Sequence, residues 1–166
     1  MKVYIGCGGA TRGRALANIL AEFIAGTIAR SECWVSHDNA AKGRQWSEQF
    51  VASLDEVAFG VMCVTPESQG SWWLLWEAGC LDSRAATLKC RVAVVVLAMA
   101  KEDLSGPWAF HQALDTTRAE LVQLIGDINA SLPEPDRASP ATLAERTALM
   151  WPQLSRRIDA ALALAP

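Results

Sequence analysis

Histidine is scarce in this sequence. The 166 residues include only two histidines, and the five cysteines form no C-x-x-C pair. Structural zinc sites draw four ligands from closely spaced cysteines and histidines, so this composition argues against a bound metal. The cysteines are scattered and odd in number, which indicates reduced thiols that serve as small core residues. We therefore expect no metal site and a cytoplasmic location.

Long apolar runs and clusters of like charge are also missing. The longest apolar stretch, residues 92–100, is far shorter than the roughly 20 residues that span a bilayer. Residues 1–9 are too short an apolar run for a signal peptide. The net charge is −3, with acids and bases interspersed, whereas nucleic-acid surfaces usually gather Lys and Arg. We expect neither a membrane span nor direct binding of nucleic acid.

Apolar residues, by contrast, are plentiful at 51%, enough for one domain over residues 1–166 to bury a core. The apolar stripe from Leu16 to Ile28 repeats in three- and four-residue steps, which is typical of an amphipathic helix. Apolar runs that stop at glycine or proline indicate strands. The predicted strands are residues 2–6, 33–36, 59–65 and 91–98. The predicted helices are residues 16–28, 44–56, 71–86, 116–132 and 141–165.

Two segments near the end of the chain break this regular alternation. Residues 101–113 mix a short turn or helix with a loop, and the last helix should bend or restart near Pro152. That helix forms a C-terminal extension of the domain at about residues 139–165. Alternating strands and helices predict an α/β fold whose parallel sheet is covered on both faces. Sites in such sheets form beyond the carboxyl ends of the strands, so residues 6–13, 36–43 and 65–73 should converge there.

The glycine-rich segment GCGGATRGR, residues 6–14, follows the first predicted strand. Its glycine spacing matches neither the G-x-G-x-x-G dinucleotide fingerprint nor a Walker loop. One interpretation is a tight turn between strand and helix. The other is a cradle for phosphate or ribose at the start of the helix, aided by Arg12 or Arg14. The residues alone leave both interpretations open.

The segment WVSHDNAAKGRQW, residues 34–46, crosses the same edge of the predicted sheet. Asp38 is suited to accept hydrogen bonds from sugar hydroxyls, but an aspartate here more often caps a turn. Trp46 is suited to stack on a base, but a tryptophan on an apolar helix face more often belongs to the core. Lys42 and Arg44 are suited to contact phosphates, although such charges are usually solvated.

The segment GSWWLLWEAGCL, residues 70–81, contains one acid among apolar residues. On a helix, Trp73 and Glu77 lie four residues apart on one face, and the helix is apolar nearly all round. A buried carboxylate costs several kcal/mol, so it is normally paired or functional. The structural alternative to a functional Glu77 is an ion pair with Arg84 or Arg91.

Four of these stretches resemble bacterial Toll/interleukin-1 receptor (TIR) domains of the anti-phage defence type. They are residues 2–6, 34–68, 71–81 and 105–115, and the resemblance continues through "LIGDINASL" to "WPQL". It covers nearly the whole chain. The W-x-x-x-E pattern of Trp73 and Glu77 is its most specific part. The "IGCGG" turn departs from the family, because Cys7 and Gly8 stand where relatives usually carry a serine-containing "ISHS"-like turn.

The resemblance implies a flavodoxin-like three-layer sandwich, with helices on both faces of a central parallel sheet of four to five strands. It also implies cleavage of the nicotinamide–ribose bond of NAD, with NAD as substrate and no cofactor. The products would be ADP-ribose or a cyclic ADP-ribose messenger. Glu77 matches the catalytic glutamate of the family. The residues expected to bind substrate are Trp73, Asp38, Cys7, Gly8, Arg12, Ser36 and Trp46.

Such domains are commonly active only when assembled, which implies a homo-oligomer and a trigger such as a separately encoded sensor or effector. Two other functions remain open at this point. One is a non-enzymatic adaptor that docks partners through its helices and residues 36–46. The other is an enzyme similar to nucleoside deoxyribosyltransferases, which share the sheet topology and use a glutamate nucleophile.

Overall fold

The computed structural model describes residues 1–36, 50–84 and 90–165 of the chain. Five parallel strands form one sheet in the order β2-β1-β3-β4-β5. Their bounds are β1 Lys2–Gly6, β2 Glu32–Val35, β3 Val57–Val64, β4 Arg91–Val96 and β5 Ala113–Leu114. This order is that of flavodoxin-like folds, so the expected α/β three-layer sandwich is confirmed.

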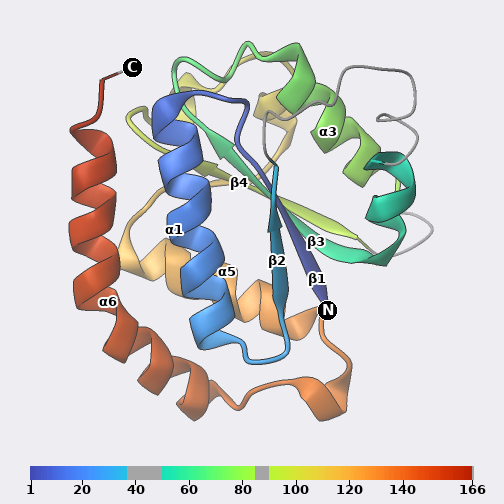
Figure 1. Ribbon diagram of the computed structural model, residues 1–166, viewed down its shortest axis with the longest axis vertical. Helices are drawn as coiled ribbons and strands as arrows, with labels where there is room; N and C mark the ends of the chain where they lie inside the picture. Colours follow the sequence, from blue (N-terminus) through green and yellow to red (C-terminus); the bar gives the residue numbers. More distant parts are fainter. Residues whose placement is uncertain (37–49, 85–89, 166) are drawn as a thin grey trace.

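The helices lie on both faces of the sheet (Figure 1). The α-helices are α1 Thr11–Thr27, α3 Trp72–Asp82, α5 Arg118–Ala130 and α6 Pro140–Leu162. The 3-10 turns are η1 Leu54–Glu56, η2 Lys101–Asp103, η3 Gly106–Phe110 and η4 Glu134–Asp136. Residues 50–53, the described part of the helix expected over 44–56, are helical and lead into η1.

The sheet separates two apolar clusters, and the central strand β3 contributes to both. Its side chains alternate, so Val61 and Cys63 pack with α1, α5 and α6, whereas Met62 and Val64 pack with α3. A strand that is buried on both faces carries apolar residues at every position, as the sequence of β3 does. Helix α3 and the start of η1 therefore cover one face, and the other three α-helices cover the opposite face.

Helix α6, the predicted C-terminal extension, contributes side chains to the core. Leu154, Ile158 and Ala161 are buried against the cluster that includes α1. Pro152 does not interrupt the helix, which runs unbroken from residue 140 to residue 162. Its direction changes part-way along (Figure 1), so the expected bend is present and the expected restart is not. Proline removes one helical hydrogen bond, which permits such a bend.

Two further differences concern short elements. The strand β5 begins at Ala113, the last residue of the segment 101–113, for which the sequence predicted a short turn or helix and a loop but no strand. It has two residues and pairs with Val94 and Val95 of β4. Helix α3 ends at Asp82, four residues before its predicted end at residue 86. Within the described ranges, no helix is both long and apolar enough to cross a membrane.

Candidate functional site

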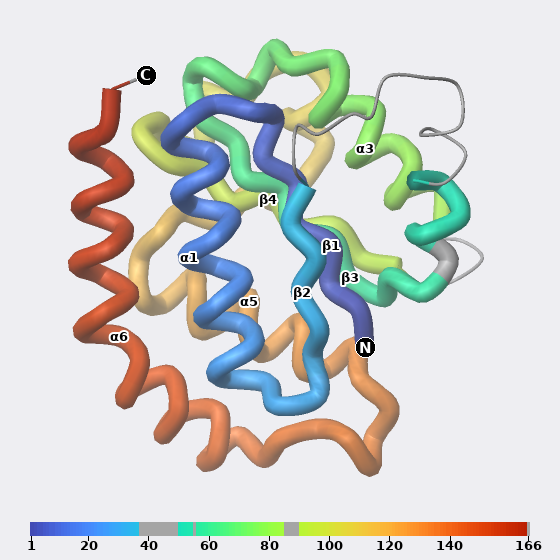
Figure 2. Tube along the Cα trace, in the orientation of Figure 1, coloured from blue at the N-terminus to red at the C-terminus, as the bar shows by residue number. Residues whose placement is uncertain are grey.

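The segments expected to converge at the carboxyl edge of the sheet do so where they are described. Strands β1 and β2 end at the same edge, beside α3 (Figure 2). The Ser36 amide, just after β2, donates to the carbonyl of Ile5 in β1 at 2.8 Å. A Cβ built on Gly8 would lie 3.1 Å from the Cβ of Ser68, which belongs to the turn after β3. Residues that follow β1, β2 and β3 therefore lie close together at the carboxyl edge of the sheet.

Helix α3 carries Glu77 to this point. Ser71 caps the helix by accepting a hydrogen bond from the Leu74 amide at 3.3 Å. Glu77 is 0% exposed. Its Oε1 accepts hydrogen bonds from the Ser36 hydroxyl at 2.7 Å and from the Trp73 indole at 2.6 Å. The helical spacing of four residues thus places the indole and the carboxylate side by side, as the W-x-x-x-E pattern predicts.

The described donors to Oε1 of Glu77 are neutral, a hydroxyl and an indole. Arg84, one of the arginines considered as an ion-pair partner, donates to the carbonyls of Cys80 at 3.1 Å and Val51 at 2.7 Å. Arg91 is exposed at the first residue of β4, at the opposite edge of the sheet. Within the described residues, this hydroxyl and this indole orient the carboxylate of Glu77 through hydrogen bonds.

Gly6 makes room for Glu77 at the end of β1. A Cβ at this position would lie 2.8 Å from the Sδ of Met62, 2.9 Å from Cδ1 of Leu74 and 3.1 Å from Oε2 of Glu77. Any side chain here would therefore press on the side chains of Met62, Leu74 and Glu77. The sequence marks the position as a glycine at a strand end, but the reason for the glycine lies in the approach of α3.

Tyr4 is a residue of this site that the sequence analysis missed. It is two residues before Gly6 on β1, so both face the same side of the sheet. The side chain is 0% exposed, and its hydroxyl has no hydrogen-bond partner within the described residues. Burial, with the nearby negative charge of Glu77, raises the pKa of Tyr4 well above its usual value. The alternation of Tyr4 and Gly6 along β1 places both residues on one face of the strand, but it does not indicate which helix covers that face.

An aromatic cluster surrounds the Trp73 indole. The Trp73 ring centroid lies 4.7 Å from that of Trp76, 5.4 Å from that of Trp72 and 6.3 Å from that of Phe50. Trp73 is half-buried, whereas Trp72 is 74% exposed. The Trp73 indole that donates to Glu77 is therefore itself partly exposed to solvent.

Cys7 and Gly8, expected to bind substrate, shape the loop that holds Ser36. The buried Cys7 thiol donates to the Ser36 carbonyl at 3.3 Å. Gly8 has a φ of +60°, a conformation that favours glycine. Gly13 of α1 packs closely against this loop, because a Cβ there would lie 2.6 Å from the Cys7 carbonyl oxygen. The segment forms the tight turn that was one of its two interpretations.

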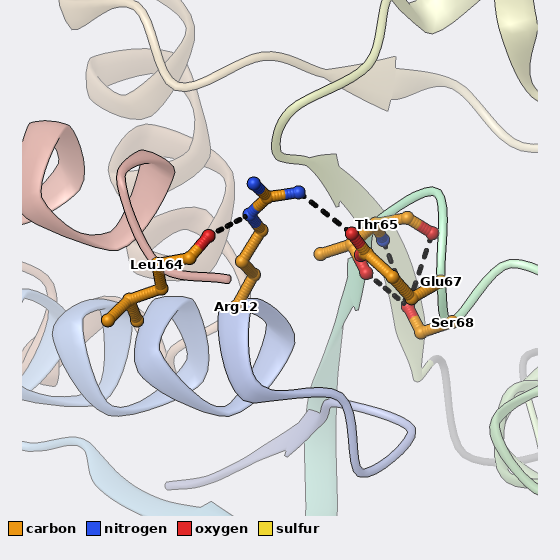
Figure 3. Close-up of polar contacts among 5 residues, drawn as sticks. All are labelled: Arg12, Thr65, Glu67, Ser68 and Leu164. Carbon is orange, nitrogen blue, oxygen red and sulfur yellow. Dashed lines mark hydrogen bonds and ion pairs between the residues drawn. The ribbon is translucent and has the colours of Figure 1, made fainter. Parts of the chain in front are cut away.

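Arg12, the expected phosphate contact, is engaged by protein groups (Figure 3). Its Nη1 pairs with Oε1 of Glu67 at 2.8 Å, and its Nε donates to the Leu164 carbonyl at 2.9 Å. A hydrogen bond from Thr65 lowers the pKa of Glu67, with a further contribution from Arg12. Glu67 is thus held as a charged partner. A phosphate that binds Arg12 would have to compete with this carboxylate.

Two predicted substrate-binding residues, Asp38 and Trp46, lie outside the described residues, as do Lys42 and Arg44.

A hollow of about 410 Å³ opens away from Glu77, near the starts of β3 and β4, and Phe59, Arg91 and Leu114 contribute to its lining. None of the predicted site residues lines this hollow. In the described parts of the chain, no cluster of three or more His, Cys, Asp or Glu has the arrangement of a metal site.

Comparison with known proteins adds no relative. No protein-family model matches the chain, and no curated protein matches its sequence. The arrangement of side chains around Glu77 therefore carries the functional proposal.

Proposed function

We propose that this chain is an NAD glycohydrolase or cyclase of the TIR type, which acts in prokaryotic immune signalling in the cytoplasm. One observation carries the proposal. A fully buried carboxylate, Glu77, is held by Ser36 and Trp73 at the carboxyl edge of a flavodoxin-like sheet. Ligands of such sheets bind at this edge. The resemblance to TIR domains supplies the substrate, NAD.

The chemistry follows from the charge that develops during bond cleavage. The bond between the ribose carbon and the pyridine nitrogen breaks, and its electron pair leaves with nicotinamide, which becomes neutral. No strong general acid is needed, because the leaving group is already cationic. The ribose acquires oxocarbenium character, which the Glu77 carboxylate stabilises. Water then attacks and loses a proton to give ADP-ribose, or an adenine nitrogen attacks to give a cyclic product.

The burial of Glu77 bears on how the site is used. A side chain that is 0% exposed meets a substrate only after its neighbours move. Ser36 and Trp73 are both partly exposed neighbours of Glu77, and we propose that the larger of them, the Trp73 indole, is displaced or packs on the nicotinamide ring. We propose that assembly into a homo-oligomer, triggered by a separately encoded sensor or effector, favours this open arrangement.

The decisive experiment follows nicotinamide release from NAD by the purified chain at high concentration or with a crowding agent. Glu77→Gln should abolish release while retaining the fold by circular dichroism. Glu22→Gln is the matched control, since it makes the same change on the surface of α1, where Glu22 pairs with Arg157. Equal release by the wild type and Glu77→Gln would refute the proposal.

A non-enzymatic interaction domain is the second candidate, and exposed aromatic side chains favour it. Trp72 at the start of α3 is 74% exposed, and Phe110 at the end of η3 is 91% exposed. Such side chains are enriched at protein interfaces. If assembled protein releases no nicotinamide, and if Trp72→Ala and Phe110→Ala abolish assembly, the adaptor function is the better description.

A further inference from the structure

The floor of the candidate site holds a titratable group that the proposed chemistry does not use. Tyr4 is completely buried on β1, beneath α3. Its ring is fixed by Trp34, with centroids 5.1 Å apart, and by Phe50, with centroids 5.5 Å apart. An aromatic ring held edge-on by two others cannot turn away, so the hydroxyl keeps its place.

The hydroxyl of Tyr4 lies close to the carboxylate of Glu77. Glu77 raises the pKa of this phenol and Ser36 lowers it, so both lie near the hydroxyl. By donor–acceptor geometry, the hydroxyl has no hydrogen-bond partner among the described residues. The Glu77 carboxylate can approach the Tyr4 hydroxyl because Gly6, the next residue on this face of β1, has no side chain. The Cβ that Gly6 lacks would lie 3.1 Å from Oε2 of Glu77, so the carboxylate sits directly on the strand.

A buried hydroxyl without a partner is costly, and a carboxylate can accept about four hydrogen bonds. We propose that Tyr4 is a positioning residue for Glu77, a reserve donor on the sheet that hydrogen-bonds the carboxylate when the side chains above it move to admit substrate. Ser36 and Trp73 hold the carboxylate from the end of β2 and from α3, and Tyr4 would hold it from β1. The carboxylate thereby keeps its charge and place during turnover. This inference rests on the proposed role of Glu77.

The first test is an NMR titration and needs no enzymatic activity. Tyr4 is the only tyrosine in the chain. Tyrosine labelled with ¹³C at Cζ therefore gives one resonance. We expect this resonance to move through an acid titration step as Glu77 takes up its proton. The step should be absent in Glu77→Gln and retained in the surface control Glu22→Gln. A resonance that shows the same step in Glu77→Gln would overturn the proposal.

The second test uses the pH profile of nicotinamide release. Tyr4→Phe keeps the ring and removes only the donor, so Glu77 becomes easier to protonate and the acid limb moves to higher pH. The expected displacement is about half a pH unit to one pH unit. A merely structural role would lower the rate without displacing the limb, and that result would overturn the proposal.

The two tests separate the inference from the proposed function. The other titratable groups that the described residues place around this pair are the thiols of Cys7, next to β1, and Cys80, on α3. Cys80→Ser should leave both the titration step and the acid limb in place. If the wild type releases no nicotinamide, the proposed function fails and the resonance still decides the contact. If Tyr4→Phe does not fold, the resonance again decides it.

Discussion

Replacing Ser36 by alanine tests whether Glu77 is charged in the folded protein. The substitution removes the 2.7 Å hydrogen bond to Oε1 of a completely buried carboxylate and leaves Trp73 as the described donor to that oxygen. Hydrogen bonds to charged groups contribute about 1.5–3 kcal/mol to stability, whereas those between neutral groups contribute about 0.5–1.5 kcal/mol. We therefore expect Ser36→Ala to lower the free energy of unfolding by about 2 kcal/mol at pH 7.

Ser31→Ala provides the matched control. The Ser31 hydroxyl is likewise part-buried and donates to neutral acceptors, the Ile28 carbonyl at the same 2.7 Å and the Ile24 carbonyl at 3.4 Å. Its loss should cost about 1 kcal/mol. Urea unfolding followed by tryptophan fluorescence measures both variants. A difference of about 1 kcal/mol separates the two midpoints by about 0.5 M urea at a typical slope of about 2 kcal/mol/M.

A double-mutant cycle with Glu77→Gln isolates the pair. If the hydroxyl stabilises a carboxylate, Ser36→Ala costs less in the Glu77→Gln background than in the wild type, with a coupling of at least about 1 kcal/mol. Equal losses in Ser36→Ala and Ser31→Ala, together with no coupling in the cycle, would refute the reasoning. Glu77 would then be neutral at pH 7 and unsuited to stabilise an oxocarbenium ion.

Three further predictions follow from packing and ionisation. Gly6→Ala should destabilise the fold by about 1–3 kcal/mol in urea unfolding and reduce nicotinamide release, because its Cβ would press on Met62 and the carboxylate; unchanged stability would contradict the close approach. Trp108→Phe should cost about 2–4 kcal/mol by the same assay, because it removes buried volume and an indole hydrogen bond to a main-chain carbonyl at 2.8 Å. Burial raises the pKa of Cys33 and Cys90 to about 11, so native iodoacetamide labelling at pH 8 should be roughly a hundredfold slower than in urea. These raised pKa values stabilise the fold below about pH 9, and that contribution should disappear as the pH rises to about 11.

The sequence by itself determined the alternation of strands and helices and the burial of one carboxylate. Helical spacing and continuous apolar runs are local patterns, so α1 was predictable from its three- and four-residue steps, and β3 and β4 were predictable from their apolar runs. The all-round apolar surface of α3 fixed the burial of Glu77 in the same way. The two-residue β5 escaped prediction, because so short a strand has no period.

Only the tertiary structure decided what surrounds Glu77. Ser36 lies 41 residues away in the chain, and the two meet because parallel strands end at one edge of the sheet. Tyr4 and Gly6 belong to the site through the approach of α3, which no local pattern records. Arg12 pairs with the carboxylate of Glu67 and donates to the carbonyl of Leu164, which lies 152 residues away in the chain. Sequence periodicity reports which side of an element is buried, whereas the partner on that side depends on strand order and on contacts between distant segments.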